Sequence, residues 1–133
     1  MIRRRTFRSP AGIAELFLAG NAVPGPNFRA EAETLLAEYR AALDDAGFAP
    51  ENALLLRFHL SDPVNQYPQL APLVAEYDLP IAVIGQPPAD GNRVALESWL
   101  WSATPRHYEA RFFHVKETTA GNSCEQLIKN IIE

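Results

Sequence analysis

A lone carboxylate interrupts the most regular apolar segment of this 133-residue chain. Residues 93–101 alternate in polarity, and the alternation places Glu97 on one strand face with Ala95 and Trp99. A carboxylate among apolar neighbours costs free energy to bury unless it is partnered. Glu97 is therefore either half of a structural ion pair or a site residue that positions water through its acid–base chemistry.

Two basic side chains alternate along a second apolar segment, residues 52–60. Arg57 and His59 lie on one face of this segment, and the opposite face is apolar. If the apolar faces of both strands meet the helices, Arg57 and His59 share the outer face with Glu97. Arg57 could then bind a substrate carboxylate, and His59 could exchange a proton near neutral pH. An Arg57–Glu97 ion pair and an exposed histidine are the structural alternatives.

A loop dense in proline and glycine precedes the strand that carries the glutamate. Residues 85–92 read Gly-Gln-Pro-Pro-Ala-Asp-Gly-Asn, so we expect irregular structure there. Gln86 precedes two rigid prolines, and its amide could face a ligand or fix the loop by a hydrogen bond. Neither a Ser/His/Asp set nor a metal-ligand spacing is visible, and we expect no metal and no cofactor.

Hydrophobic periodicity indicates the elements that position these side chains. Strands are expected at residues 3–7, 14–19, 52–60, 81–84 and 93–101. A helix is expected at residues 28–46, with Asn27 as its cap and Gly47 as its stop. A second helix is expected to start at Pro63, with Asp62 as its cap. The order β-β-α-β-α-β-β predicts an α+β two-layer sandwich with the helices on one sheet face.

Two more elements are expected beyond Pro105, a strand at residues 108–116 and a helix at residues 123–133. We therefore divide the chain into a domain at residues 1–117 and a C-terminal helical extension at residues 118–133. The extension is apolar enough to need a surface to cover, either on this chain or on a neighbouring subunit.

The outer face of the expected sheet is too apolar to face water. It carries the side chains of Leu55, Ala95, Trp99 and Trp101. Exposed patches of this kind usually mark an oligomer interface. We therefore expect other subunits to cover this face.

Composition and charge argue against several classes of protein. The formal net charge of -4 is unfavourable for nucleic-acid binding, and the basic run Arg3-Arg4-Arg5 is interpreted as a solvated strand edge. No apolar segment approaches the ~20 residues of a membrane span. The single Cys124 cannot form an intrachain disulfide, so a reduced, cytoplasmic protein is expected, without nucleic acid or membrane as a partner.

Several segments together resemble the RidA/YjgF family of small trimeric proteins, also described as endoribonuclease L-PSP-like. LFLAGN at residues 16–21 is similar to the family's strand and glycine before its first helix. VALESW at residues 94–99 resembles the late strand that carries the family's glutamate. The helix ending in Ala-Gly at residue 47 and the strand ending in Asp62 fit the same pattern. RFHLSDPVNQ and GQPPADG resemble one branch of the family, which is distantly chorismatase-like.

The resemblance implies a homotrimer whose three sheets form a central barrel, with clefts between subunits. It also implies a small-molecule hydrolase that converts reactive enamines and imines to keto acids and ammonia. Glu97 matches the family's water-positioning glutamate and Gly20 its loop glycine, whereas the family's carboxylate-binding arginine is missing before residue 81. Arg57 and Gln86 would then hold the ligand, a small molecule with a carboxylate or carbonyl group. The alternative is a non-catalytic ligand-binding or regulatory trimer of the same fold.

Overall fold

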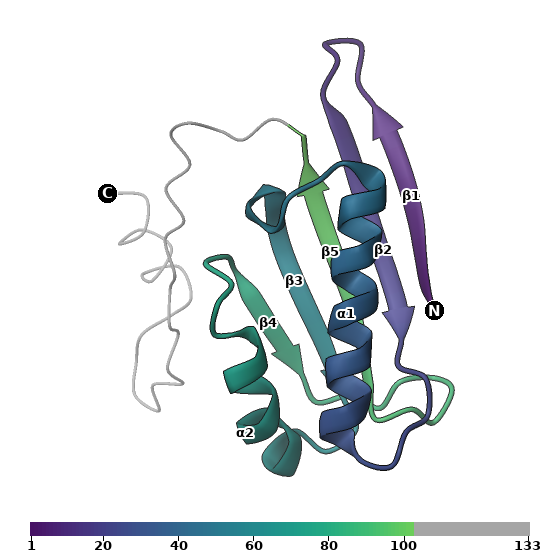
Figure 1. The fold of residues 1–133 in the computed structure, drawn as a ribbon, viewed down its shortest axis with the longest axis vertical. Helices are drawn as coiled ribbons and strands as arrows, with labels where there is room; N and C mark the ends of the chain where they lie inside the picture. The colour runs from purple at the N-terminus through teal and green to yellow at the C-terminus, as the bar shows by residue number, and fades with distance from the viewer. Residues whose placement is uncertain (103–133) are drawn as a thin grey trace, which may run out of the picture.

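The computed structural model describes residues 1–102, which form a five-stranded sheet with two helices packed on one face (Figure 1). In chain order the elements are β1 (Ile2–Arg8), β2 (Ala14–Asn21), α1 (Phe28–Ala46), a 3-10 turn (Pro50–Asn52), β3 (Ala53–Leu60), α2 (Pro63–Val74), β4 (Ile81–Ile84) and β5 (Val94–Trp101). This arrangement confirms the predicted α+β two-layer sandwich. The strand expected at residues 108–116, the helix expected at residues 123–133 and the boundary expected after residue 117 lie outside the described residues.

Local sequence signals define both ends of α1. The Asn27 side chain accepts a hydrogen bond from the Ala30 backbone N–H at 2.9 Å. Gly47 ends the helix in the left-handed conformation, with φ of 76°. The apolar stripe that the 3.6-residue period predicted is buried in the structure and consists of Phe28, Ala32, Leu35, Leu36, Tyr39 and Leu43.

The second helix also begins where its signals predict. Asp62 caps α2, and Pro63 occupies its first position. Two prolines inside the helix, Pro68 and Pro72, remove backbone donors, and α2 ends at Val74. Figure 1 shows α2 beside α1, over the β3 and β4 side of the sheet.

β5 lies at the centre of the sheet, although it is the last of the described strands. The strand order is β1-β2-β5-β3-β4. β5 is antiparallel to both β2 and β3, and β4 is parallel to β3. The strand residues that face the helices are fully buried and include Leu16, Leu18, Leu56, Phe58, Leu96 and Leu100. The burial confirms the core faces that alternation predicted for β2 and β5.

The expected faces are wrong at the first residues of β3 and just before β5. A β-bulge between Ala53 and Leu55 shifts the alternation, so Ala53 joins the core and Leu54 does not. Arg93 was expected on the outer face, but it precedes β5 and its Nη1 atom lies 2.7 Å from Glu31 Oε1 on α1. Both errors have one cause, because side chains alternate only within a regular strand.

Candidate functional site

The sheet face that points away from the helices carries one row of residues across four strands. Arg3 of β1 lies opposite Ala19 of β2. Ala19 in turn lies opposite Glu97 of β5, and Glu97 lies opposite Arg57 of β3. Residues directly opposite one another point to the same face. The register therefore brings Arg57, His59 and Glu97 together, as alternation predicted, and adds Arg3 to their face.

The Glu97 carboxylate has two basic neighbours, both at the long limit of a hydrogen bond. Its Oε2 atom lies 3.4 Å from Arg57 Nη1 and 3.4 Å from His59 Nε2. The Glu97 side chain is 51% exposed, so solvent screens both pairs and each contributes little to stability. The carboxylate therefore keeps the capacity to accept a hydrogen bond from water or from a ligand.

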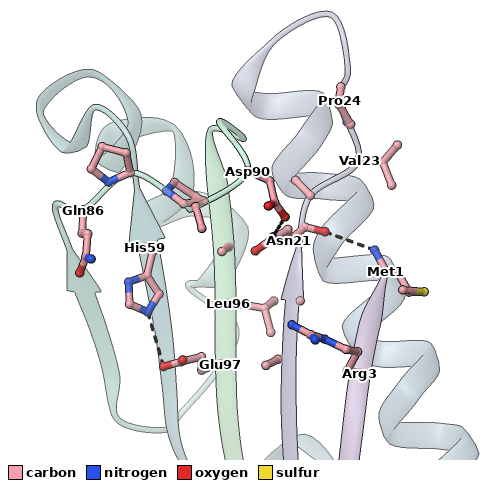
Figure 2. Close-up of a pocket in the computed structure, with 17 residues that line it drawn as sticks. Met1, Arg3, Asn21, Val23, Pro24, His59, Gln86, Asp90, Leu96 and Glu97 are labelled. Atoms are coloured by element: carbon pink, nitrogen blue, oxygen red, sulfur yellow. Dashed lines mark hydrogen bonds and ion pairs between the residues drawn. The ribbon is translucent and has the colours of Figure 1, made fainter.

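Glu97 and His59 lie on the wall of a cleft of about 730 Å³ (Figure 2). The walls come from β1, the end of β2 and the loop after it, β3, β5 and the loop between β4 and β5. The polar side chains of the lining are Arg3, Asn21, His59, Gln86, Asp90 and Glu97. Alanine, valine and proline residues supply much of the apolar part of the lining. The cleft is therefore a concave surface of mixed polarity on which several polar groups converge, as they do in small-molecule sites.

Two contacts hold the loop between β4 and β5 in place. Asn21 Nδ2 donates to Asp90 Oδ2 at 2.7 Å, which joins the loop to the end of β2. Gly85 lets the loop approach α2, because a Cβ there would lie 2.9 Å from Pro63 Cγ. Within residues 1–102, the side-chain amide of Gln86 has no hydrogen-bond partner. The loop is therefore tied to β2 through Asp90 and runs close to α2 at Gly85, while the Gln86 amide remains available to a ligand.

Three of the four predicted site residues, Glu97, Gln86 and Gly20, line this cleft. Gly20 contributes only backbone, because a Cβ there would point into β1 and lie 2.7 Å from Ile2 Cγ1. Arg57 lines a separate hollow of about 360 Å³, on the aromatic side of Glu97. Ala19 and Glu97 line both hollows, so Arg57 lies next to the cleft and not among the residues that line it.

Arg3, Asn21 and Asp90 line the cleft, although they were not expected from the sequence to be site residues. Arg3 was interpreted as part of a solvated strand edge. Strand alternation gives the face of Arg3 but not the strand that lies beside β1. Asn21 and Asp90 are 69 residues apart in the chain, so no local pattern indicates their contact.

Four aromatic side chains form a continuous ladder on the other half of the same sheet face. Phe7 packs edge-on against Phe17 with ring centroids 6.0 Å apart. Phe17 stacks on Trp99 at 5.9 Å, and Trp99 meets Trp101 edge-on at 5.8 Å. Phe7 is 57% and Phe17 39% exposed, and both described helices lie on the opposite face (Figure 1). We refer to Phe7, Phe17, Trp99 and Trp101 as the outer aromatic face.

The cleft offers a ligand carboxylates, an imidazole, amides and a guanidinium. In the part of the chain that the structure describes, no three His, Cys, Asp or Glu side chains are grouped so that they could hold a metal ion. The helices of residues 1–102 are too short or too polar to cross a membrane.

The fold is shared with solved structures of YjgF proteins. A member of the YjgF/YER057c/UK114 family from Mycobacterium tuberculosis is 16% identical, with a TM-score of 0.55 over 74% of this chain and 99% of that one. A YjgF-family protein from Neisseria meningitidis is 18% identical, with a TM-score of 0.57 over 74% and 93% of the two chains. A candidate endonuclease from Aeropyrum pernix is 15% identical, with a TM-score of 0.61 over 73% and 91%. No family model and no curated protein matches the sequence.

The structural similarities confirm the RidA/YjgF resemblance at the level of the fold. The matches cover 91 to 99% of each of these neighbours and 73 to 74% of this chain. At sequence identities of 15 to 18%, these similarities show a shared course of the backbone and not a shared set of site residues. The chemistry must therefore be argued from the side chains of this cleft.

Proposed function

We propose that this chain is a RidA-type hydrolase of small enamines and imines. The observation that carries the proposal is the place of Glu97, a half-exposed carboxylate 3.4 Å from His59 on the wall of a cleft. In the sequence resemblance, Glu97 also matches the family's water-positioning glutamate. The proposed substrates are small molecules with a carboxylate or carbonyl group, of a size that suits the cleft.

Glu97 would act on water in this reaction. Its carboxylate accepts a hydrogen bond from a water molecule and so orients the water oxygen toward the carbon of a C=N bond. Water adds to that carbon and one of its protons passes to the nitrogen, which gives a carbinolamine. The remaining hydroxyl proton then passes to the nitrogen as the C–N bond breaks and the C=O bond forms. His59 is placed to carry this proton. An imine and water thus give a ketone and ammonia, and an enamine follows the same path after protonation of its carbon.

The proposal includes a homotrimer in which the clefts lie between subunits. The outer aromatic face supports this assembly, because a single chain leaves Phe7 and Phe17 exposed beside two tryptophans. Apolar surface of this kind favours association with further copies of the chain. The cleft borders this face at Glu97, so a neighbouring subunit would lie close to the proposed water site.

A non-catalytic ligand-binding or regulatory trimer is the second candidate. Two observations favour it. Residues 78–81 before β4 contain no arginine, where the family resemblance implies one. Arg57, the replacement expected from the sequence, pairs with Glu97 and lines the other hollow. A cleft of this composition could bind a ligand without hydrolysing it.

Glu97→Gln separates the two candidates, because it keeps the size of the side chain and removes its charge. We expect ammonia release from freshly generated 2-iminopropionate to fall by roughly 100- to 10,000-fold. The thermal midpoint should change little, because the exposed pairs with Arg57 and His59 contribute little stability. Glu33→Gln, on the exposed side of α1, is the matched control and should keep the wild-type rate.

Two outcomes would contradict parts of this proposal. An unchanged rate in the Glu97→Gln variant would remove Glu97 from the mechanism. If the wild-type protein releases no ammonia while a deaminating homologue does so under the same conditions, the non-catalytic trimer becomes the better description.

A further inference from the structure

We propose that Arg3 binds the carboxylate group of the ligand in this cleft. The inference rests on the proposed function in one respect, since it takes the ligand to be a small acid. It assigns to Arg3 the role that sequence analysis gave to Arg57. Charge pairing, strand register and the direction of the Arg3 side chain support this role.

Charge pairing distinguishes Arg3 from most arginines of the described chain. The arginines with an ion pair are Arg4, Arg29, Arg40, Arg57 and Arg93. Arg3 lines the cleft and has no hydrogen bond or ion pair within residues 1–102. The ammonium of Met1, which also lines the cleft, donates to Asn21 O and lies 3.3 Å from Glu38 Oε2. Among the described residues that line the cleft, Arg3 is therefore the guanidinium or ammonium group that remains available to an anion.

Strand register sets the distance between Arg3 and Glu97. The two residues are on the same sheet face with only Ala19 of β2 between them. Adjacent strands are about 4.8 Å apart, so their Cα atoms are separated by roughly 10 Å. The methyl group of Ala19 leaves the space above β2 open. A short acid lying over Ala19 could thus present its carboxylate to Arg3 and its reactive carbon toward Glu97.

Figure 2 shows how the side chains use this space. The Arg3 side chain extends from β1 across β2 in the direction of Leu96 and β5. The Glu97 carboxylate is turned the other way, toward His59. The guanidinium and the carboxylate therefore do not neutralise each other, and a ligand can lie between them. A guanidinium presents a planar pair of donors that matches a carboxylate bidentately.

Arg5 provides a matched control on the same strand. It lies two residues after Arg3 on the same face of β1, opposite Phe17 beside the outer aromatic face. Like Arg3, it is exposed and has no ion pair within residues 1–102. Replacing either residue changes the net charge by the same amount, so any difference between the two variants comes from position.

The test is equilibrium binding of 2-oxobutanoate, measured by isothermal titration calorimetry on the full chain. The chain should carry no N-terminal tag, because the Met1 ammonium is bound beside the cleft. Arg3→Gln should weaken binding by about 10- to 100-fold, as expected for the loss of a charge-assisted hydrogen-bonded pair. Arg3→Lys should lose less affinity, since it keeps the charge but not the bidentate geometry. Arg5→Gln should bind as the wild type does.

The binding measurement tests the assignment of Arg3, and the turnover measurement tests the hydrolase proposal. Equal affinity in the Arg3→Gln and Arg5→Gln variants would overturn the assignment of Arg3, as would a wild-type protein that does not bind 2-oxobutanoate. Because all variants replace exposed side chains that have no partner within residues 1–102, equal thermal midpoints should accompany the affinity change. If ammonia release is absent but binding still depends on Arg3, the assignment of Arg3 stands and only the hydrolase proposal falls.

Discussion

Two positions beside the cleft require glycine, because neighbouring atoms lie too close to leave room for a Cβ. Neither Gly20 nor Gly85 has a positive φ, so turn geometry does not explain them. A Cβ at Gly20 would lie 2.8 Å from the Met1 carbonyl oxygen, and one at Gly85 would lie 2.9 Å from Pro63 Cγ. Each glycine therefore lets a separate wall of the cleft pack closely, β1 in one case and the loop after β4 in the other.

Gly20→Ala should destabilise the protein and loosen β1. The added methyl group would meet the backbone of Met1, which cannot rotate away as a side chain can. Overpacking of this kind costs about 1–3 kcal/mol of the free energy of unfolding, which urea denaturation can measure. Amide hydrogen exchange in β1 should become faster. Wild-type stability together with wild-type exchange would contradict the tight β1–β2 contact.

At the scale of elements, a buried polar pair joins α1 to the sheet. Tyr39 Oη and Ser98 Oγ are 2.9 Å apart, and Ser98 Oγ donates to the Leu55 carbonyl oxygen at 3.1 Å. Burial raises the pKa of Tyr39 to about 12, and the hydrogen bond with Ser98 offsets part of this effect. Tyr39 therefore stays protonated in the folded state at a pH where an unfolded tyrosine has already ionised.

The raised pKa makes stability depend on pH in alkaline solution. The contribution of Tyr39 is fully present below about pH 10, where the unfolded state begins to ionise, and it is lost as the pH rises toward 12. The loss amounts to about 2–3 kcal/mol for a shift of this size. Urea unfolding between about pH 9 and pH 11.5 should show a steeper fall for the wild type than for Tyr39→Phe. Parallel curves for the two proteins would show that Tyr39 ionises equally easily in both states.

Elements were predictable from the sequence where their signals are local. Asn27, Gly47 and Asp62 mark helix ends through hydrogen bonds or backbone geometry within a few residues. The bulge after Ala53 and the contact of Arg93 with α1 depend on partners about 40 to 60 positions away in the chain, and no local pattern encodes them.

The residues of the candidate site were predictable where strand alternation alone determines their position. Glu97 and His59 were placed on one face because each strand alternates, and the structure confirms that they meet. Arg3 was missed because its relation to Glu97 depends on the position of β2 between them. Arg57 was expected to hold the ligand, and the register places it directly beside Glu97, where it lines the hollow that continues to Trp99.

At the scale of the whole molecule, the helices of residues 1–102 cover one face of the sheet and leave the other face without a helix. The helices bury the first, and the outer aromatic face occupies half of the second. Ala95 is buried even in the single chain, whereas Trp99 and Trp101 are only partly covered. The predicted trimer would remove this partly exposed apolar surface from water.

Phe17→Glu should therefore prevent assembly without unfolding the chain, because Phe17 is 39% exposed in the monomer. Light scattering at micromolar concentration should give about three times the 14.8 kDa chain mass for the wild type. It should give a value close to the single chain for the variant. Val64→Glu replaces an 82% exposed apolar residue on α2, far from this face, and should leave the mass unchanged. A monomeric wild type would overturn the trimer.

The central position of β5 also has a consequence for the order of events during synthesis. β2 and β3 leave the ribosome before β5, yet they become parts of one sheet only when β5 inserts between them. Pairings of such long sequence separation form slowly, and until then both strands carry an unpaired edge. The cleft walls come from β1, β2, β3 and β5, so a chain that has not yet inserted β5 has no cleft. Ligand binding should therefore appear in refolding experiments only with the last, slowest step, and it reports completed folding.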